Sequence, residues 1–192
     1  MTIRLVFHHD YEVSVLGELP GGGHTADRLY FPGGSKDGGR DGLIVDVTPK
    51  TGMSWHGIFE FGNADRRGLT GVFSSPDPRS MVVVSAGQGA LVRTDDPQIW
   101  SRLPTFPVTN VLELVEQGLL LVSDYTTVAA FAAQGLKWRT QRLSWDGVGL
   151  GLVEGTWING FGWDPTGHGK VGFEINLESG EHRGGVSPDP PS

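Results

Sequence analysis

Glycine and proline recur along the whole chain and interrupt almost every extended apolar run. Among 192 residues there are 30 glycines and 12 prolines. They are spread between valine- and leucine-rich runs rather than collected in one tract, which indicates many turns. Helical windows are scarce, and the best of them, residues 110–117, reads equally well as an alternating strand. We therefore predict an all-β chain of short antiparallel strands.

Several apolar runs give clear strand signals. Residues 81–85, 119–123 and 171–177 are the strongest of these runs. Near the start of the chain, apolar residues alternate along 3–7 and predict an opening strand, and the alternation along 11–15 predicts its neighbour.

The middle of the chain repeats itself. Segment 81–103 matches segment 119–141 in the order strand, turn, strand, turn and tryptophan, so that Trp138 takes the place of Trp100. A unit of several strands in about 40 residues is typical of β-propeller blades. We expect an antiparallel meander of propeller-like hairpin repeats, with both tryptophans packed beneath hairpins. A β-sandwich or barrel is the alternative, because hairpins resemble one another in any all-β protein.

Chain length favours a single domain. A chain of 192 residues can bury a sizeable core without further stabilisation. We expect one all-β domain over residues 1–185. Residues 186–192 are rich in proline and serine and are predicted to form a disordered tail.

The overall composition excludes several classes of function. Cysteine is absent, so disulfides, thiolate metal sites and cysteine nucleophiles are excluded. The net charge of −7 opposes binding to a phosphate backbone, and we expect no nucleic-acid partner. The first residues lack a signal-peptide pattern, and no apolar run is long enough to span a bilayer. We expect a cytoplasmic protein, bacterial in style, with no membrane partner.

Two tryptophan–aspartate pairs are the most distinctive candidate chemistry. Trp145-Asp146 precedes a glycine, and Trp163-Asp164 precedes a proline. The structural interpretation, which we favour, is that each tryptophan closes the core while each aspartate accepts turn amides. The functional interpretation is a site for a sugar or another small polar ligand, in which tryptophan faces stack on rings and carboxylates accept hydroxyl hydrogens. His168 follows in the same loop and would add a donor.

The same region resembles a known family. Residues 142–147 (RLSWDG), residues 162–164 (GWD), Phe173 and the glycines of 179–185 are similar to the C-terminal pattern of a family of short uncharacterised bacterial proteins. The resemblance covers roughly residues 70 to 185. It implies one compact fold and no known activity, so it transfers no catalytic residue.

The remaining polar residues form no familiar catalytic or metal motif. His8 and His9 lie at the end of the first predicted strand, and neighbours in an extended chain point to opposite faces, so the two cannot easily chelate one metal. A metal site built from His9, Asp10 and a distant histidine is a weaker alternative, and we expect no metal and no cofactor. The sequence has no G-x-S-x-G nucleophile motif.

These patterns favour a non-catalytic β module that binds a protein partner or a small polar ligand. One alternative is a glycan-active or metal-assisted hydrolase that uses Asp146 or Asp164, and another is a structural scaffold subunit. A shallow aromatic surface would indicate a binding module, and a broad apolar surface would indicate a scaffold. A deep pocket with several ionisable groups of shifted pKa would indicate an enzyme. No pattern in the sequence specifies an oligomeric state.

Overall fold

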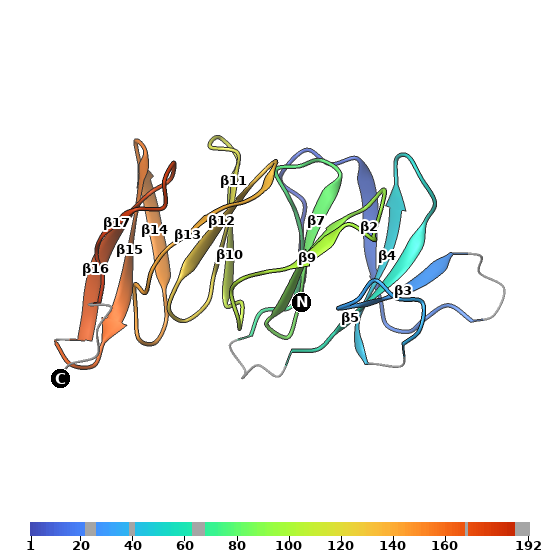
Figure 1. Cartoon of the computed structure of the whole chain (residues 1–192), viewed down its shortest axis with the longest axis horizontal. Coiled ribbons are helices and arrows are strands. Elements are labelled where there is room, and N and C mark those ends of the chain that lie inside the picture. The colour runs from blue at the N-terminus through green and yellow to red at the C-terminus, as the bar shows by residue number, and fades with distance from the viewer. Residues whose placement is uncertain (22–25, 39–40, 63–67, 168, 187–192) are drawn as a thin grey trace. The chain divides into compact units, whose positions relative to one another are not determined.

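The chain consists of β-strands joined by turns and loops (Figure 1). A computed structural model describes residues 1–21, 26–38, 41–62, 68–167 and 169–186. The described residues form 17 strands in four mostly antiparallel sheets, without a helix and without a sheet closed into a barrel. The prediction of an all-β antiparallel fold is therefore confirmed.

The chain divides into two compact units, Met1–Pro107 and Val108–Ser192, which we call unit 1 and unit 2. Whether the two units behave as the single domain expected for residues 1–185 stays a prediction. Val186, the first residue of the expected tail, is buried, and its N–H donates to the carbonyl oxygen of Leu143. The rest of that tail, residues 187–192, lies outside the described residues.

Unit 1 contains two sheets. Sheet I has the strand order β2-β4-β5-β3 and consists of β2 (Tyr11–Leu16), β3 (Asp27–Phe31), β4 (Gly42–Pro49) and β5 (Trp55–Glu60). Sheet II has the order β1-β6-β7-β8-β9 and consists of β1 (Thr2–Arg4), β6 (Gly71–Ser74), β7 (Ser80–Ser85), β8 (Gln88–Arg93) and β9 (Trp100–Arg102). The pairs β3–β5 and β1–β6 are parallel, whereas the other pairs of unit 1 are antiparallel.

Unit 2 contains two antiparallel meanders whose strands follow chain order. Sheet III consists of β10 (Asn110–Leu114), β11 (Leu119–Ser123), β12 (Val128–Ala132) and β13 (Gly135–Arg139). Sheet IV consists of β14 (Gly149–Glu154), β15 (Trp157–Asp164), β16 (Gly169–Asn176) and β17 (His182–Gly184). The three strongest strand predictions coincide with β7, β11 and β16. The ambiguous window at 110–117 begins with β10, which ends at Leu114, and a turn follows rather than a helix.

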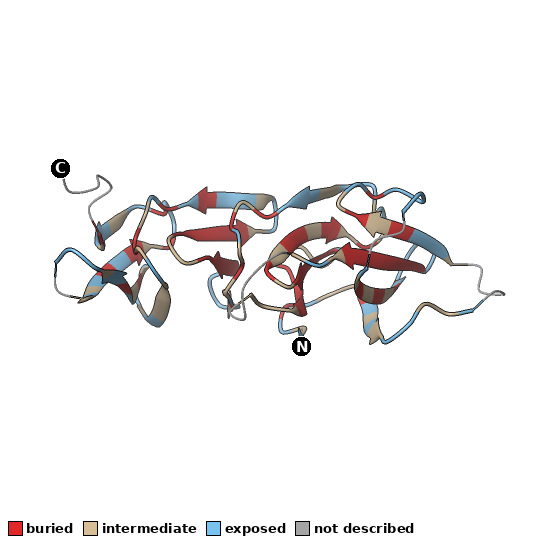
Figure 2. Ribbon diagram, turned by 90° about the horizontal axis from the view of Figure 1, so that it is seen from below, coloured by how far each residue is buried: buried red, intermediate tan, exposed pale blue. Residues whose placement is uncertain are grey.

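The two sheets of each unit pack on one another through an apolar core. In unit 1 the core includes Val45 and Val47 of sheet I and Val83 of sheet II. In unit 2 it includes Leu121 of sheet III and Ile175 of sheet IV. Every residue of β7 and of β11 is buried, whereas β14 has no buried residue. Figure 2 shows the buried residues in red.

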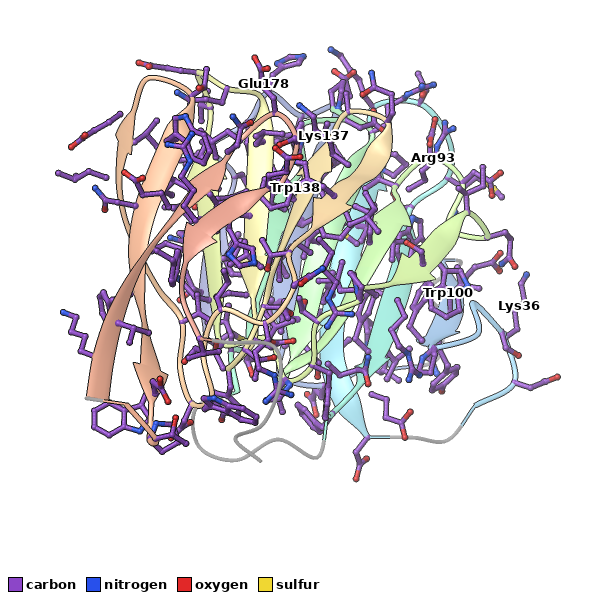
Figure 3. The ribbon with its side chains drawn as sticks, turned by 60° about the vertical axis from the view of Figure 1, so that its left-hand side comes forward. Lys36, Arg93, Trp100, Lys137, Trp138 and Glu178 are labelled. Atoms are coloured by element: carbon purple, nitrogen blue, oxygen red, sulfur yellow. The ribbon has the colours of Figure 1, made fainter. Side chains whose placement is uncertain are left out.

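A buried tryptophan connects the two sheets in each unit. In unit 1, the indole Nε1–H of Trp55 on β5 donates to the carbonyl oxygen of Thr94, just after β8, at 2.9 Å. In unit 2, the indole Nε1–H of Trp138 on β13 donates to the carbonyl oxygen of Leu177, just after β16, at 3.0 Å. Trp138 lies next to Lys137 on β13 (Figure 3). These bonds satisfy a donor that burial would otherwise leave unpaired.

The repeated hairpins share a register at their tryptophans. Trp100 pairs with Val92, and Trp138 pairs with Ala130, which is the same offset in both segments. The preceding turns differ, because Ser85 pairs with Gln88 whereas Ser123 pairs with Val128. A propeller arrangement of these repeats stays a prediction.

The two tryptophans are not buried to the same degree. Trp138 is only 8% exposed, which confirms that it packs in the core. Trp100 is partly buried against the core of unit 1, and its ring lies edge-on to Phe31 with 5.7 Å between ring centroids.

The prediction for the first two strands was wrong in its pairing. Strand β1 ends at Arg4 and pairs with β6 in sheet II, whereas β2 pairs with β4 in sheet I. Phe7, expected within the opening strand, is buried outside any strand, and its N–H donates to Ser74 Oγ at 2.9 Å. Alternation along a strand shows which side chains share a face. It does not show which other strand forms hydrogen bonds with it, because that depends on the tertiary fold.

An ion pair lies next to the hydrogen bond between Trp55 and Thr94. Arg93 donates to both carboxylate oxygens of Asp95, at 3.0 and 2.7 Å, and Arg79 lies 3.8 Å from the same carboxylate. The hydrogen bonds from Arg93 hold the pKa of Asp95 below its usual value, and they outweigh the opposing effect of burial. The pair encloses Thr94, whose carbonyl oxygen accepts the indole of Trp55.

Removing the Trp138 indole should destabilise unit 2. We expect Trp138→Ala to lower the free energy of unfolding by about 3–5 kcal/mol, the usual cost of deleting a buried aromatic side chain. Trp138→Phe should cost less, because it fills most of the space but leaves the Leu177 carbonyl without its donor. Trp100→Ala should also cost less than Trp138→Ala, since Trp100 is only partly buried. Urea unfolding of the three variants measures this, and an unchanged midpoint for Trp138→Ala would contradict the role of this anchor.

The Asp95 pair should make stability depend on pH. Because the pKa of Asp95 is lower in the folded than in the unfolded chain, its contribution is present above pH ~4 and is lost as the pH falls through the folded value. We therefore expect Asp95→Asn to destabilise the protein at pH 7 and to lose that effect at low pH. Urea unfolding of wild type and variant at pH 7 and pH 3 gives the comparison. If wild type and Asp95→Asn differ in free energy of unfolding by the same amount at pH 7 and pH 3, the charge of the carboxylate is not the cause.

Candidate functional site

Three aromatic side chains lie on the solvent-facing side of β15. Successive side chains of a strand point to opposite faces. Ile158 is fully buried toward the core shared with sheet III, so Trp157, Phe161 and Trp163 lie on the opposite, outer face of sheet IV. Phe161 is 45% exposed and Trp163 is 48% exposed. We call these three residues the aromatic row.

Glycines next to the aromatic row leave room for its rings. Gly149 on β14 pairs with Phe161 on β15, and a Cβ at Gly149 would overlap the Phe161 ring. A Cβ at Gly169 would lie 3.1 Å from Trp163 Cζ3, and the φ of +85° at Gly169 also favours glycine. On the other side, Gly172 pairs with Phe161 and has open space above it. The rings of Phe161 and Trp163 therefore lie close against Gly149 and Gly169, and the surface beside Phe161 is open at Gly172.

Cations cover two rings of the row. Lys170 Nζ lies 3.8 Å from the centroid of the Phe161 ring. Arg183 Cζ lies 4.3 Å from the centroid of the Trp157 ring. Cation–π contacts of this kind are worth roughly 0.5–1 kcal/mol at exposed sites. They hold the charged groups over the surface, where the N–H groups can also donate to a ligand.

The loop between β13 and β14 brings the two tryptophan–aspartate pairs side by side. The N–H of Trp145 donates to the carbonyl oxygen of Trp163 at 2.9 Å. The N–H of Trp163 donates to the hydroxyl of the buried Ser144 at 2.8 Å. The approach requires glycine at 162, since a Cβ there would lie 2.6 Å from the carbonyl oxygen of Leu143. Segments that are far apart in sequence thus form one surface region.

The two pairs differ in how their side chains are used. Asp164 Oδ1 accepts hydrogen bonds from the N–H and the hydroxyl of Thr166, at 2.9 and 2.8 Å, as the structural interpretation predicts for a turn aspartate. Asp146 is exposed, and its N–H donates to Ser144 Oγ at 3.2 Å. Trp145 is half-buried, and Arg142 Cζ lies 4.1 Å from its ring centroid. Whether Trp145, Asp146, Trp163 and Asp164 bind a ligand stays a prediction.

The remaining candidate residues lie elsewhere or outside the described part of the chain. His168 is not among the described residues. The His9 ring lies in unit 1, where its Nδ1 is 2.9 Å from the carbonyl oxygen of Phe7, and Asp10 pairs with Lys50 at 3.1 Å. Within the described ranges, no three histidine, aspartate or glutamate side chains gather as metal ligands. The same ranges contain no helix long and apolar enough to cross a membrane.

An open hollow of about 660 Å³ lies at one end of the aromatic row. We call it the β13–β17 hollow; the described residues that line it are Arg139, Gln141, Trp157, Ser179, Gly180, Glu181, His182 and Arg183. Its lining is mostly polar and includes two arginines and one glutamate, and it shares Trp157 with the aromatic row.

The sequence analysis missed most of this surface. It identified Trp163, but not Trp157, Phe161, Lys170 or Arg183. The period-two alternation of aromatic residues along 157–163 was available as a signal. The role of the cations was not, because Lys170 and Arg183 reach the rings from neighbouring strands.

Comparison with known proteins adds no function. The chain matches no known family profile, and its sequence matches no curated protein. The resemblance to a family of short bacterial proteins therefore stays a prediction.

The turn at Asp164 offers a direct test of the structural interpretation. Asp164→Ala should lower the free energy of unfolding by about 1 kcal/mol, because the Thr166 N–H and hydroxyl lose their acceptor. Asp164→Asn is the matched control, since its amide oxygen can still accept these bonds and should keep most of the stability. Thermal unfolding of both variants measures the difference. Equal melting temperatures for wild type and Asp164→Ala would show that this carboxylate is not needed for the turn.

Proposed function

We propose that this protein is a non-catalytic module that binds a glycan through the aromatic row of sheet IV. The observation that carries the proposal is the exposure of Phe161 and Trp163 on the outer face of sheet IV, where Gly172 leaves open space beside Phe161. Large aromatic side chains seldom remain this exposed in a group without a binding role.

The chemistry of the surface suits a sugar ring. The face of an aromatic ring carries partial negative charge, and it therefore attracts the weakly positive C–H groups of a pyranose. Polar groups beside the rings can bond the hydroxyls: Lys170 and Arg183 donate, and Glu174 lies exposed on the same face between β15 and β17. Flat apolar rings with a polar border suit a sugar better than a fully apolar ligand.

The dimensions favour an oligosaccharide over a single sugar. From Trp157 to Trp163 the strand advances six residues, which is about 20 Å at the usual rise per residue. Asn159, between the rings, accepts a hydrogen bond from the N–H of Leu152 at 3.0 Å, across the irregular pairing of β14. This contact ties the row to its neighbouring strand and supports a preformed platform.

The ionisable groups give less support to the hydrolase alternative. Burial raises the pKa of Tyr11, but its hydroxyl donates to the carbonyl oxygen of Ser80, a structural contact. Asp95, whose pKa is lowered, is paired with Arg93. Both groups lie in unit 1, away from the aromatic row in the sequence, and Asp164 is engaged in its own turn. A cytoplasmic location and the absence of a nucleic-acid partner remain part of the proposal.

Electrophoresis through gels that contain soluble polysaccharides tests the proposal. A panel of neutral glycans, including hydroxyethylcellulose, galactan and xylan, should retard the wild-type protein in at least one gel. Phe161→Ala and Trp163→Ala should each weaken that retardation about tenfold or more, equivalent to ~1.4 kcal/mol or more of lost stacking. The same melting temperature in wild type and variants would show that folding is intact.

Leu152→Ala is the matched control. Leu152 is 73% exposed on β14 of the same sheet, but it does not belong to the aromatic row. Its removal should leave retardation unchanged. If Leu152→Ala weakens binding as much as Trp163→Ala, the sheet face binds through general apolar contact and not through the aromatic row. If no glycan retards the wild-type protein, the proposed function is wrong.

A further inference from the structure

We infer that the β13–β17 hollow is a subsite for an anionic group, so that this protein prefers acidic glycans that carry carboxylate substituents over neutral ones. This inference rests on the proposed function, because the hollow shares Trp157 with the aromatic row. The inference names a class of glycan, because stacking on aromatic rings alone would not distinguish acidic from neutral sugars. The argument depends on how two arginine side chains and one histidine are held around the hollow.

Arg183 is positioned by the ring of Trp157. It lies on β17 opposite Glu174, and its guanidinium carbon Cζ lies over the Trp157 ring, 4.3 Å from the ring centroid. Stacking occupies the flat face of a guanidinium, while its N–H groups point outward in the plane. A carboxylate can therefore accept a pair of hydrogen bonds from the edge of Arg183 without displacing it from the ring.

Arg139 of β13 also lines the hollow and is held in place by its neighbours. Its Nε and Nη2 donate to Thr127 Oγ1, at 3.3 and 3.2 Å, which uses two of its five N–H groups. The buried Asp124 lies 3.8 Å from Nη2 and helps to fix the guanidinium. Asp124 is itself satisfied by the N–H and hydroxyl groups of Thr126 and Thr127. Arg139 is thus preorganised, although Asp124 offsets part of its charge.

His182 adds a third nitrogen group. Its Nδ1 lies 3.1 Å from the carbonyl oxygen of Gly184, which can only accept, so Nδ1 carries the proton. Its Nε2 is then the ring nitrogen left to contact a ligand in the hollow.

The charge of the hollow is opposite to that of the chain. The net charge of the whole protein is −7, yet the described lining of the hollow includes the two cations Arg139 and Arg183 against the single acid Glu181. A local positive region on an acidic protein attracts an anion at short range, and exposed charges of this kind are screened by salt. This complementarity favours a carboxylated glycan over a neutral one.

Two celluloses that differ in charge test the inference. Carboxymethylcellulose and hydroxyethylcellulose share a backbone, but only the first carries carboxylates, so the ratio of the two affinities isolates the anionic subsite. We expect the wild type to prefer carboxymethylcellulose at low salt. Arg183→Gln should lower the ratio about tenfold, whereas Glu181→Gln should raise it. Isothermal titration calorimetry at two salt concentrations measures both affinities.

Arg102→Gln controls for net charge. Arg102 is exposed on β9 in unit 1, and its replacement changes the total charge by the same amount as Arg183→Gln. An unchanged ratio in Arg102→Gln, with opposite shifts in the two hollow variants, would support the subsite. A ratio that neither hollow variant changes, or that Arg102→Gln lowers equally, would overturn it while leaving the glycan proposal intact. Failure of all glycans to bind would instead refute the proposed function.

Discussion

The packing of paired sheets around a buried tryptophan is the constraint on which both units depend. A sheet with one apolar face must cover that face, and an indole buried between two sheets must still find an acceptor for its N–H. Trp55 and Trp138 meet both needs, because each fills core volume and bonds a carbonyl oxygen at a strand end of the facing sheet. These bonds fix how the facing sheets are offset. In unit 2 they commit one face of sheet IV to sheet III and leave the other to solvent.

The exposed face of sheet IV follows from that commitment. Ile158 and Ile175 fill the core side, so the alternate positions of β15 and β16 must face outward. Exposed aromatic residues would ordinarily be an aggregation risk on such a face. Here the cations Lys170 and Arg183 lie over the rings, which keeps the surface polar enough for water and suited to a polar ligand with a flat apolar side.

The structural and ligand-binding interpretations of the tryptophan–aspartate pairs concern different atoms. The backbone of Trp163 bonds Ser144 and Trp145, which joins the loop after β13 to the end of β15. Its indole is 48% exposed on the outer face. One residue can therefore hold the fold through its main chain and present its side chain to a ligand. The carboxylate of Asp164, by contrast, already serves its turn.

The sequence by itself determined the local structure: where strands such as β7 and β11 begin and end, that Trp138 packs inward, and that Asp164 opens a turn. These features depend on period-two alternation and on turn chemistry, which act between residues close in the chain. Only the tertiary structure decided that β1 pairs with β6, that Trp157 lies beneath Arg183, and that Arg139 and His182 line one hollow. Alternation shows that a strand has two faces, but which face is covered depends on the sheet that packs against it. A site shared by several strands therefore exists only after the sheets have packed.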